Sequence, residues 1–233
     1  MTLLAGLSGL VIGNLLDVVI ARQLASAHRV RTPRRKGPLD WVPILGAWRR
    51  RQWLALAVEV VTGVMAAALF SRYGLSARSL VLFGAALVLI DTGAIDFKVR
   101  MIDTLVLMVA TVAVLALAPF NLAPFNAASW LASAFGLALA GVMFVFLFLL
   151  AKVLFRGVAA PFGLGDVFLA AFIGALVGFQ ELSVALFYGI AMAGVVSLVL
   201  LILRGTGRKI PTYIAYGTYL CLGALLFLAT RAF

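Results

Sequence analysis

The chain has 233 residues, of which 65% are hydrophobic and 12% charged, with a mean hydropathy of +1.17 and a formal net charge of +11. Soluble domains are about half apolar and about a quarter charged, so this composition excludes an ordinary soluble domain and predicts an integral membrane protein. The single cysteine, Cys221, excludes a disulfide framework or a multi-cysteine zinc site within the chain.

Apolar stretches recur along the whole chain, and their length suits membrane-spanning α-helices of about 17–25 residues rather than barrel strands. We therefore predict an all-α polytopic membrane protein with about eight transmembrane helices, forming one integral-membrane domain over residues 1–233. In chain order, the predicted spans are Thr2–Ala21, Gln52–Phe70, Arg78–Ile95, Thr104–Ala118, Trp130–Leu154, Asp166–Phe179, Leu182–Leu203 and Thr212–Thr230.

Basic residues are distributed unevenly between the two sides of these spans. The short loop region after the first span, residues 22–51, holds nine Lys and Arg; all loops on its side hold sixteen, against three on the opposite side. By the positive-inside rule, the basic loops face the cytoplasm and both termini lie outside. Membrane lipid headgroups are the expected contact of this charge, and we expect no nucleic-acid partner.

Two aspartates fall at the predicted cytoplasmic face. Asp96 lies at the cytoplasmic end of the third span, directly after Ile95, and Asp166 is at the cytoplasmic start of the sixth. A carboxylate at such a depth is costly and marks a candidate functional site. Two carboxylates that share one proton can divide the work of hydrolysis: the ionised one removes a proton from water, and the other donates to the scissile carbonyl oxygen. The chain contains no G-x-S-x-G, H-E-x-x-H or phosphate-loop motif, so an enzyme here would work with carboxylates.

Two glycines precede the second aspartate in the run Gly163-Leu164-Gly165-Asp166. Glycine lets backbone approach closely and adopts strained dihedral angles, so we predict that Gly163 and Gly165 support the site by admitting an extended substrate backbone. As a lone pattern, G-x-G-D is weak, because an Asp after glycines is also a common helix cap.

Two further carboxylates are candidates for supporting roles. Asp91 precedes Asp96 by five residues, so on one continuous helix the two would lie about 140° apart. Asp91 is an alternative first aspartate of the pair. Glu59 is predicted to be a buried polar partner that supports the site without taking part in catalysis.

Small residues spaced four apart are predicted to serve helix packing rather than chemistry. Two such pairs occur, Gly136/Ala140 and Gly174/Gly178.

Longer motifs resemble a known family. GLGDVFLAAFIGALVGF (Gly163–Phe179) resembles the G-x-G-D-x-K-L-x-A-x-x-G segment of bacterial prepilin peptidases, the type IV leader peptidases. IDFKVRMIDTLVL (Ile95–Leu107) resembles their first aspartate motif, in which an Asp is followed by a hydrophobic-Pro-Asp or hydrophobic-Pro-Asn triplet. Three more segments are similar to family segments in the family's order: GLVIGNLLDVVIARQ (Gly9–Gln23), WVPILGAW (Trp41–Trp48) and Gln52–Val60, which contains Glu59.

The resemblance implies an eight-helix G-x-G-D membrane aspartyl peptidase of the bacterial plasma membrane, with Asp96 and Asp166 as the catalytic pair. It implies prepilin or pseudopilin precursors as partners, whose basic leader is removed after a glycine at the cytoplasmic face. Proteolysis of this kind needs no metal or other cofactor. S-adenosylmethionine would be a cofactor if the new N-terminus is also methylated, as in many bacterial members.

The chain departs from the family pattern at three points. Asp103-Thr104 stands where the family has Pro-Asp, and Phe168 stands where it has Lys. The paired C-x-x-C motifs of the cytoplasmic loop are absent, so no zinc is expected in residues 22–51 and methyltransferase activity is left open. Two alternatives remain: a non-catalytic homologue, and a proton-coupled transporter, which would place its carboxylates near midspan of inverted repeats.

Overall fold

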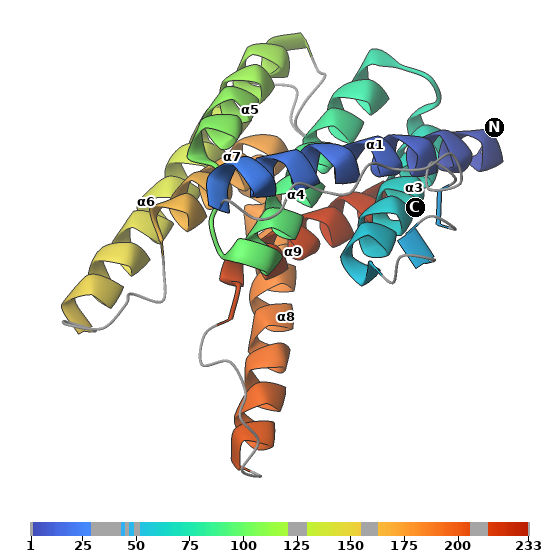
Figure 1. The fold of residues 1–233 in the computed structure, drawn as a ribbon. Helices are drawn as coiled ribbons and strands as arrows, with labels where there is room; N and C mark the ends of the chain where they lie inside the picture. The colour runs from blue at the N-terminus through green and yellow to red at the C-terminus, as the bar shows by residue number, and fades with distance from the viewer. Residues whose placement is uncertain are drawn as a thin grey trace.

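The computed structural model describes residues 2–28, 43–44, 47–48, 52–120, 130–154, 163–205 and 214–232. Over these residues the protein is all-α, with eight α-helices and one 3-10 turn (Figure 1). The elements are α1 (Thr2–His28), α3 (Trp53–Tyr73), α4 (Ala77–Val99), α5 (Thr104–Leu117), η2 (Ala118–Phe120), α6 (Trp130–Leu154), α7 (Leu164–Val177), α8 (Phe179–Gly205) and α9 (Tyr216–Ala232).

The helices follow the order of the eight predicted apolar stretches, and several of their boundaries differ from the prediction. Helix α4, for example, ends at Val99 rather than at Ile95, so Asp96 lies within it. Helix α1 continues to His28, seven residues beyond the predicted end, because the added segment contains neither proline nor glycine. Helix α7 ends at Val177 rather than at Phe179, and α8 begins directly at Phe179. Gly178 separates them with a φ of +77°, a conformation that glycine adopts without strain.

Five of the described helices are long and apolar enough to cross a membrane: α1, α3, α4, α6 and α8. This indicates a multi-pass membrane protein. Helices α5 and α7 are apolar but have only 14 residues each, and α9 has 17. A 14-residue helix is about 21 Å long, which is less than the roughly 30 Å of a bilayer's hydrocarbon core.

Helices α6 and α7 touch backbone to backbone through glycines. A Cβ atom built on Gly174 would lie 2.2 Å from the carbonyl oxygen of Gly136 and 2.9 Å from the Cβ of Ala140. A Cβ on Gly136 would likewise lie 2.2 Å from the Gly174 oxygen and 2.9 Å from the backbone of Gly178. Only glycine permits this approach, and the prediction that these small residues serve packing is confirmed.

Helices α8 and α9 are joined in two ways. A Cβ on Gly223 would lie 2.2 Å from the backbone nitrogen of Gly189, so glycines again bring two backbones together. Near the other end of the pair, Nη2 of Arg231 lies 2.7 Å from Oε2 of Glu181. These contacts, with those between α6 and α7, fix the positions of the helices that frame the site described below.

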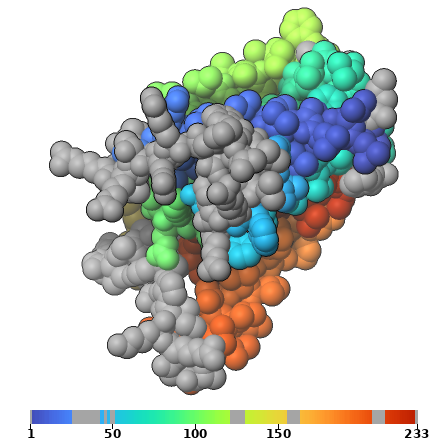
Figure 2. Space-filling view, turned by 45° about the vertical axis from the view of Figure 1, so that its right-hand side comes forward, coloured from blue at the N-terminus to red at the C-terminus, as the bar shows by residue number. Residues whose placement is uncertain are grey.

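The core lies where α4, α7 and α9 pack together, and the outer helices expose apolar side chains. Leu89, Phe172 and Phe227 are fully buried in this core. The buried residues of α8 all precede or lie near its midpoint, and its second half extends beyond the other helices in Figure 1. Blue atoms of α1 and orange atoms of α8 lie at the surface in Figure 2. Such an apolar exterior suits contact with lipid.

We expect Gly174→Ala to lower the stability of the protein. The added Cβ would meet a backbone carbonyl of α6, which cannot move without shifting the helix, and overpacking of this kind costs about 1–3 kcal/mol. The matched control is Gly194→Ala on α8, where a Cβ meets nothing within 4 Å. Thermal unfolding in detergent should show a lower Tm for Gly174→Ala alone; an equal Tm for both variants would contradict the packing described.

Candidate functional site

The side chains of Asp96 and Asp166 meet at the first turn of α9. A Cβ atom built on Gly217, in that turn, would lie 3.0 Å from Oδ2 of Asp96 and 3.2 Å from Oδ1 of Asp166. Because both oxygens lie within 3.2 Å of one point, they can be no farther apart than twice that distance. Both side chains are buried, with 5% and 8% of their surface exposed. The structure therefore brings together the two aspartates that the sequence singled out, and their catalytic role stays a prediction.

Asp96 is held by the N-terminus of another helix. It lies in the last turn of α4, where the helix dipole disfavours a negative charge. The backbone N–H of Thr218 donates to Oδ2 of Asp96 at 2.7 Å, and Oγ1 of Thr218 donates to the same oxygen at 3.0 Å. The first N–H groups of a helix have no hydrogen-bond partner within it. The start of α9 can therefore donate hydrogen bonds to the Asp96 carboxylate, which the carbonyl groups at the end of α4 cannot do.

Asp166 is held by its own helix. It is the third residue of α7, and its Oδ2 accepts the backbone N–H of Gly163 at 2.9 Å. The backbone N–H of Asp166 in turn donates to the carbonyl oxygen of Gly163 at 3.2 Å. A carboxylate at this position is favoured by the positive end of the helix dipole. One oxygen of Asp166 is thus engaged locally, and Oδ1 faces Gly217 and Asp96.

The two glycines of the G-x-G-D run have different roles. A Cβ on Gly165 would lie 2.7 Å from the Cβ of Ile102, so a side chain from the link between α4 and α5 requires glycine there. Around Gly163 the nearest such atoms are 3.8 Å away, and its φ of −97° and ψ of 163° are ordinary extended values. Neither glycine has a positive φ, and their role in admitting an extended substrate backbone stays a prediction.

The supporting carboxylates bind elsewhere. Asp91 lies on a different side of α4, and its carboxylate accepts a hydrogen bond from the side chain of Gln23 on α1. Glu59 on α3 is fully buried, and its Oε2 accepts the backbone N–H of Ile44. Ile44 has a φ of +64°, which is unusual for a β-branched residue, and the Glu59 carboxylate holds that turn. Asp91 and Glu59 therefore have partners on other parts of the chain and are not among the carboxylates that lie beside Gly217.

Sequence reasoning did not single out Gly217 and Thr218. A Thr near the start of a helix is a familiar capping signal, but it points to partners in its own helix. Here the partner is an aspartate 122 residues earlier in the chain. The Gly-Thr pair at the start of the last apolar run is the only local signal, and it does not identify that partner.

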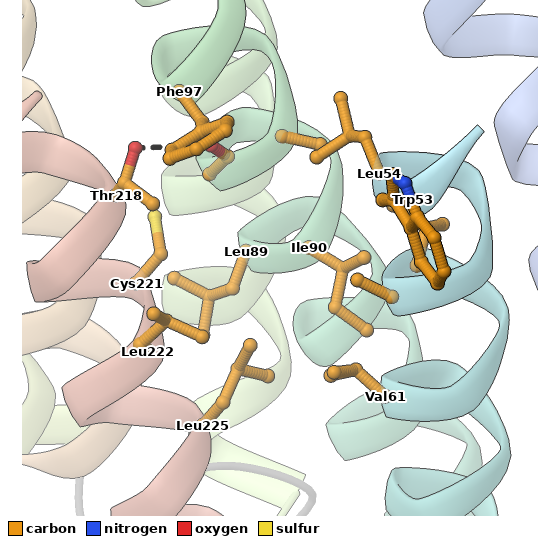
Figure 3. A pocket seen from close by; sticks show the side chains of 14 residues that line it. Trp53, Leu54, Val61, Leu89, Ile90, Phe97, Thr218, Cys221, Leu222 and Leu225 are labelled. Carbon is orange, nitrogen blue, oxygen red and sulfur yellow. Dashed lines mark hydrogen bonds between the residues drawn. The ribbon is translucent and has the colours of Figure 1, made fainter. Parts of the chain in front are cut away.

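An apolar cavity of about 340 Å³ lies between α3, α4 and α9, and Thr218 is part of its lining. Figure 3 shows Trp53 and Leu54 on one side of it and Cys221 and Leu222 on the other. Thr218 is a polar residue of the lining, and its Oγ1 also lies 3.1 Å from the carbonyl oxygen of Gly93, the bond dashed in Figure 3. The cavity thus reaches the residue that holds Asp96.

Within the described part of the chain, no group of three or more His, Cys, Asp and Glu side chains could hold a metal ion. Most of residues 22–51, where the basic loop and the absence of zinc were predicted, lies outside the described residues. No protein-family model, curated protein or solved structure matches the chain. The resemblance to prepilin peptidases therefore depends on the motifs quoted above.

Cysteines placed at positions 96 and 166 should be joined by a short bifunctional thiol reagent. In a Cys221→Ala background, Asp96→Cys and Asp166→Cys bring both thiols to the space beside Gly217. The matched control is Asp91→Cys with Asp166→Cys, because Asp91 binds α1 instead. Mass spectrometry of the digested protein should find the 96–166 link formed faster than the 91–166 link; the reverse order would contradict the arrangement.

Proposed function

We propose that this chain is a membrane aspartyl endopeptidase that removes the basic leader from type IV prepilins or pseudopilins. Its dyad is Asp96 and Asp166. The observation that carries the proposal is the convergence of these two buried carboxylates on Gly217 from separate helices. The motif resemblance supplies the class of substrate, and the carboxylate pair supplies chemistry that suits peptide hydrolysis.

The pair would act as acid and base in turn. The ionised carboxylate removes a proton from water as the water oxygen attacks the scissile carbonyl carbon, and the protonated carboxylate gives its proton to the carbonyl oxygen. The tetrahedral intermediate then collapses with cleavage of the C–N bond: the departing amine takes the proton that the base acquired, and the other carboxylate takes a proton back from one hydroxyl of the intermediate. This division requires two carboxylates close enough to share one proton, and the absence of a side chain on Gly217 leaves the space between them open.

The membrane arrangement follows from the charges and the helix ends. We place eight spans in the bacterial plasma membrane, with the basic loops and the site facing the cytoplasm and both termini outside. Sixteen basic residues on one side against three on the other support this orientation. Asp96 in the last turn of α4 and Asp166 in the first turn of α7 lie at helix ends, whereas a transporter would place them near midspan.

The apolar cavity beside Thr218 suits the apolar part of a precursor next to the scissile bond. Proteolysis needs no cofactor. Methylation of the mature N-terminus with S-adenosylmethionine is a separate activity, which the mass of that N-terminus after incubation with S-adenosylmethionine decides.

Replacing either aspartate of the dyad should greatly slow cleavage. The protein is reconstituted in liposomes with a precursor that carries a basic leader, a glycine and an apolar segment, and leader removal is followed by mass spectrometry. Asp96→Asn and Asp166→Asn should each lower the rate about 10²- to 10⁴-fold, because each removes a group that transfers a proton.

The matched control is Asp91→Asn, which removes a carboxylate from the same helix while leaving the dyad in place. It should keep most of the wild-type rate. Wild-type rates in both dyad variants would contradict the assignment of Asp96 and Asp166, and an inactive wild-type protein would favour the non-catalytic homologue.

Filling the cavity should weaken substrate binding. Ala57 lines the cavity from α3, and Ala57→Trp would occupy much of its volume. We expect KM to rise at least about tenfold with little change in kcat, since the larger side chain takes away apolar packing around the substrate and leaves the dyad intact. The control is Val64→Trp, on an exposed position of the same helix outside the cavity lining. Equal KM values for the two variants would exclude the cavity from substrate binding.

A further inference from the structure

Thr218 gives Asp96 two hydrogen bonds from one residue. Its backbone N–H lies 2.7 Å from Oδ2 of Asp96, and its Oγ1 lies 3.0 Å from the same oxygen. Thr218 itself is buried, with 9% of its surface exposed. A buried carboxylate oxygen that accepts two donors from one direction has a fixed orientation and no remaining lone pair toward α9.

These contacts differ from those of an ordinary helix cap. A capping Thr accepts, through its hydroxyl oxygen, an N–H of its own helix. The hydroxyl of Thr218 points instead toward α4, where its two acceptors are Oδ2 of Asp96 and, at 3.1 Å, the carbonyl oxygen of Gly93. The hydroxyl has one proton and can donate it to only one of these acceptors at a time. The bond to Asp96 is favoured over the bond to Gly93 when the Asp96 carboxylate is ionised, because a charged acceptor forms the stronger hydrogen bond.

Among the described residues, no single residue gives Asp166 two hydrogen bonds in the way that Thr218 does for Asp96. Its Oδ2 accepts one backbone N–H, from Gly163 of the same chain segment, and its Oδ1 faces the space beside Gly217. The two carboxylates are therefore held unequally. The orientation of Asp96 depends on the hydroxyl and backbone N–H of a residue on another helix, whereas that of Asp166 depends on a backbone N–H directly before its own helix.

We propose that Thr218 is a positioning residue of the dyad, an inference that rests on the proposed peptidase function. Its hydroxyl and N–H together fix the rotamer of Asp96 and keep Oδ2 an acceptor, so that the proton shared by the pair lies on another oxygen. The backbone N–H alone would leave Asp96 with one hydrogen bond from Thr218, and the hydroxyl adds a second one that limits rotation of the carboxylate.

Three variants separate positioning from folding. Thr218→Val keeps the volume and the backbone N–H and removes the hydroxyl, Thr218→Ser restores the hydroxyl, and Thr218→Ala is a second hydroxyl-free variant should valine impair folding. The matched control is Thr230→Val on the same helix, where Oγ1 donates only to a backbone carbonyl, that of Phe227. Thermal unfolding in detergent establishes that each variant is folded.

We expect kcat for cleavage of the prepilin-like precursor to fall about 10- to 100-fold in Thr218→Val, the factor that one hydrogen bond to a charged group provides. KM should change much less than kcat, since Thr218→Val keeps the volume of this residue in the cavity lining and removes only the hydroxyl that contacts Asp96. Thr218→Ser and Thr230→Val should both stay close to the wild-type kcat. A wild-type kcat in folded Thr218→Val or Thr218→Ala, or a change confined to KM, would overturn the positioning role and leave the peptidase intact.

A second readout does not need activity. In protein labelled with ¹³C at the aspartate side-chain carboxyl, Asp96→Asn identifies the Asp96 resonance. Thr218→Val should shift that resonance, and Thr218→Ser and Thr230→Val should not; an unshifted resonance would overturn the inference. If the wild-type protein cleaves no precursor, the proposed peptidase fails, and the role of Thr218 in cleavage fails with it.

Discussion

Two carboxylates buried side by side in an apolar bundle are the constraint on which the site depends. A charge taken out of water is costly unless hydrogen-bond donors replace its hydration, and a second carboxylate nearby adds repulsion. The fold meets this constraint with helix N-termini: the start of α9 donates to Asp96, and the residue that precedes α7 donates to Asp166. Neither of these bonds involves a basic side chain, so they do not hold both carboxylates in the ionised form as a salt bridge would.

Glycines make this convergence sterically possible. Gly217 leaves room for both carboxylates, and Gly165 lets α7 begin against Ile102. Farther from the two aspartates, Gly174 allows the backbone of α7 to contact that of α6, and Gly223 allows the backbone of α9 to contact that of α8. The positions of the two N-terminal turns are therefore determined by backbone contacts between helices, which are stiffer than contacts between long side chains.

The helices could be predicted from the sequence because apolar stretches of spanning length are a strong signal. Their ends were less predictable: the break at Gly178 depends on one left-handed residue, and the extension to His28 on the absence of any helix breaker. Topology and motif order placed Asp96 and Asp166 at one level, and the structure agrees on their proximity. The bonds from Thr218 could not be predicted, because no local pattern encodes a contact 122 residues away.

One of the positions at which the chain differs from the prepilin-peptidase motifs that it resembles has a clear role in the fold. Asp103 begins α5 as its N-cap, and its Oδ1 accepts the N–H groups of Leu105 at 3.0 Å and Val106 at 3.4 Å. An Asp before an apolar run is a preferred helix start, so this position serves the fold without a proline. For Phe168, which is about one-third exposed on α7, the structure does not explain why this position differs from the lysine of the motif.

The unequal anchoring of the dyad has a mechanical consequence. Asp166 moves with α7, because its partner Gly163 adjoins that helix, whereas the orientation of Asp96 depends on how α4 and α9 are placed relative to each other. A hydrogen bond weakens steeply as its geometry departs from the optimum, so a small shift of α9 along α4 would release Asp96 while leaving Asp166 held. The same α4–α9 contact borders the apolar cavity through Thr218 and Cys221. The cavity and Asp96 therefore have one residue in common, Thr218, which lines the first and donates hydrogen bonds to the second.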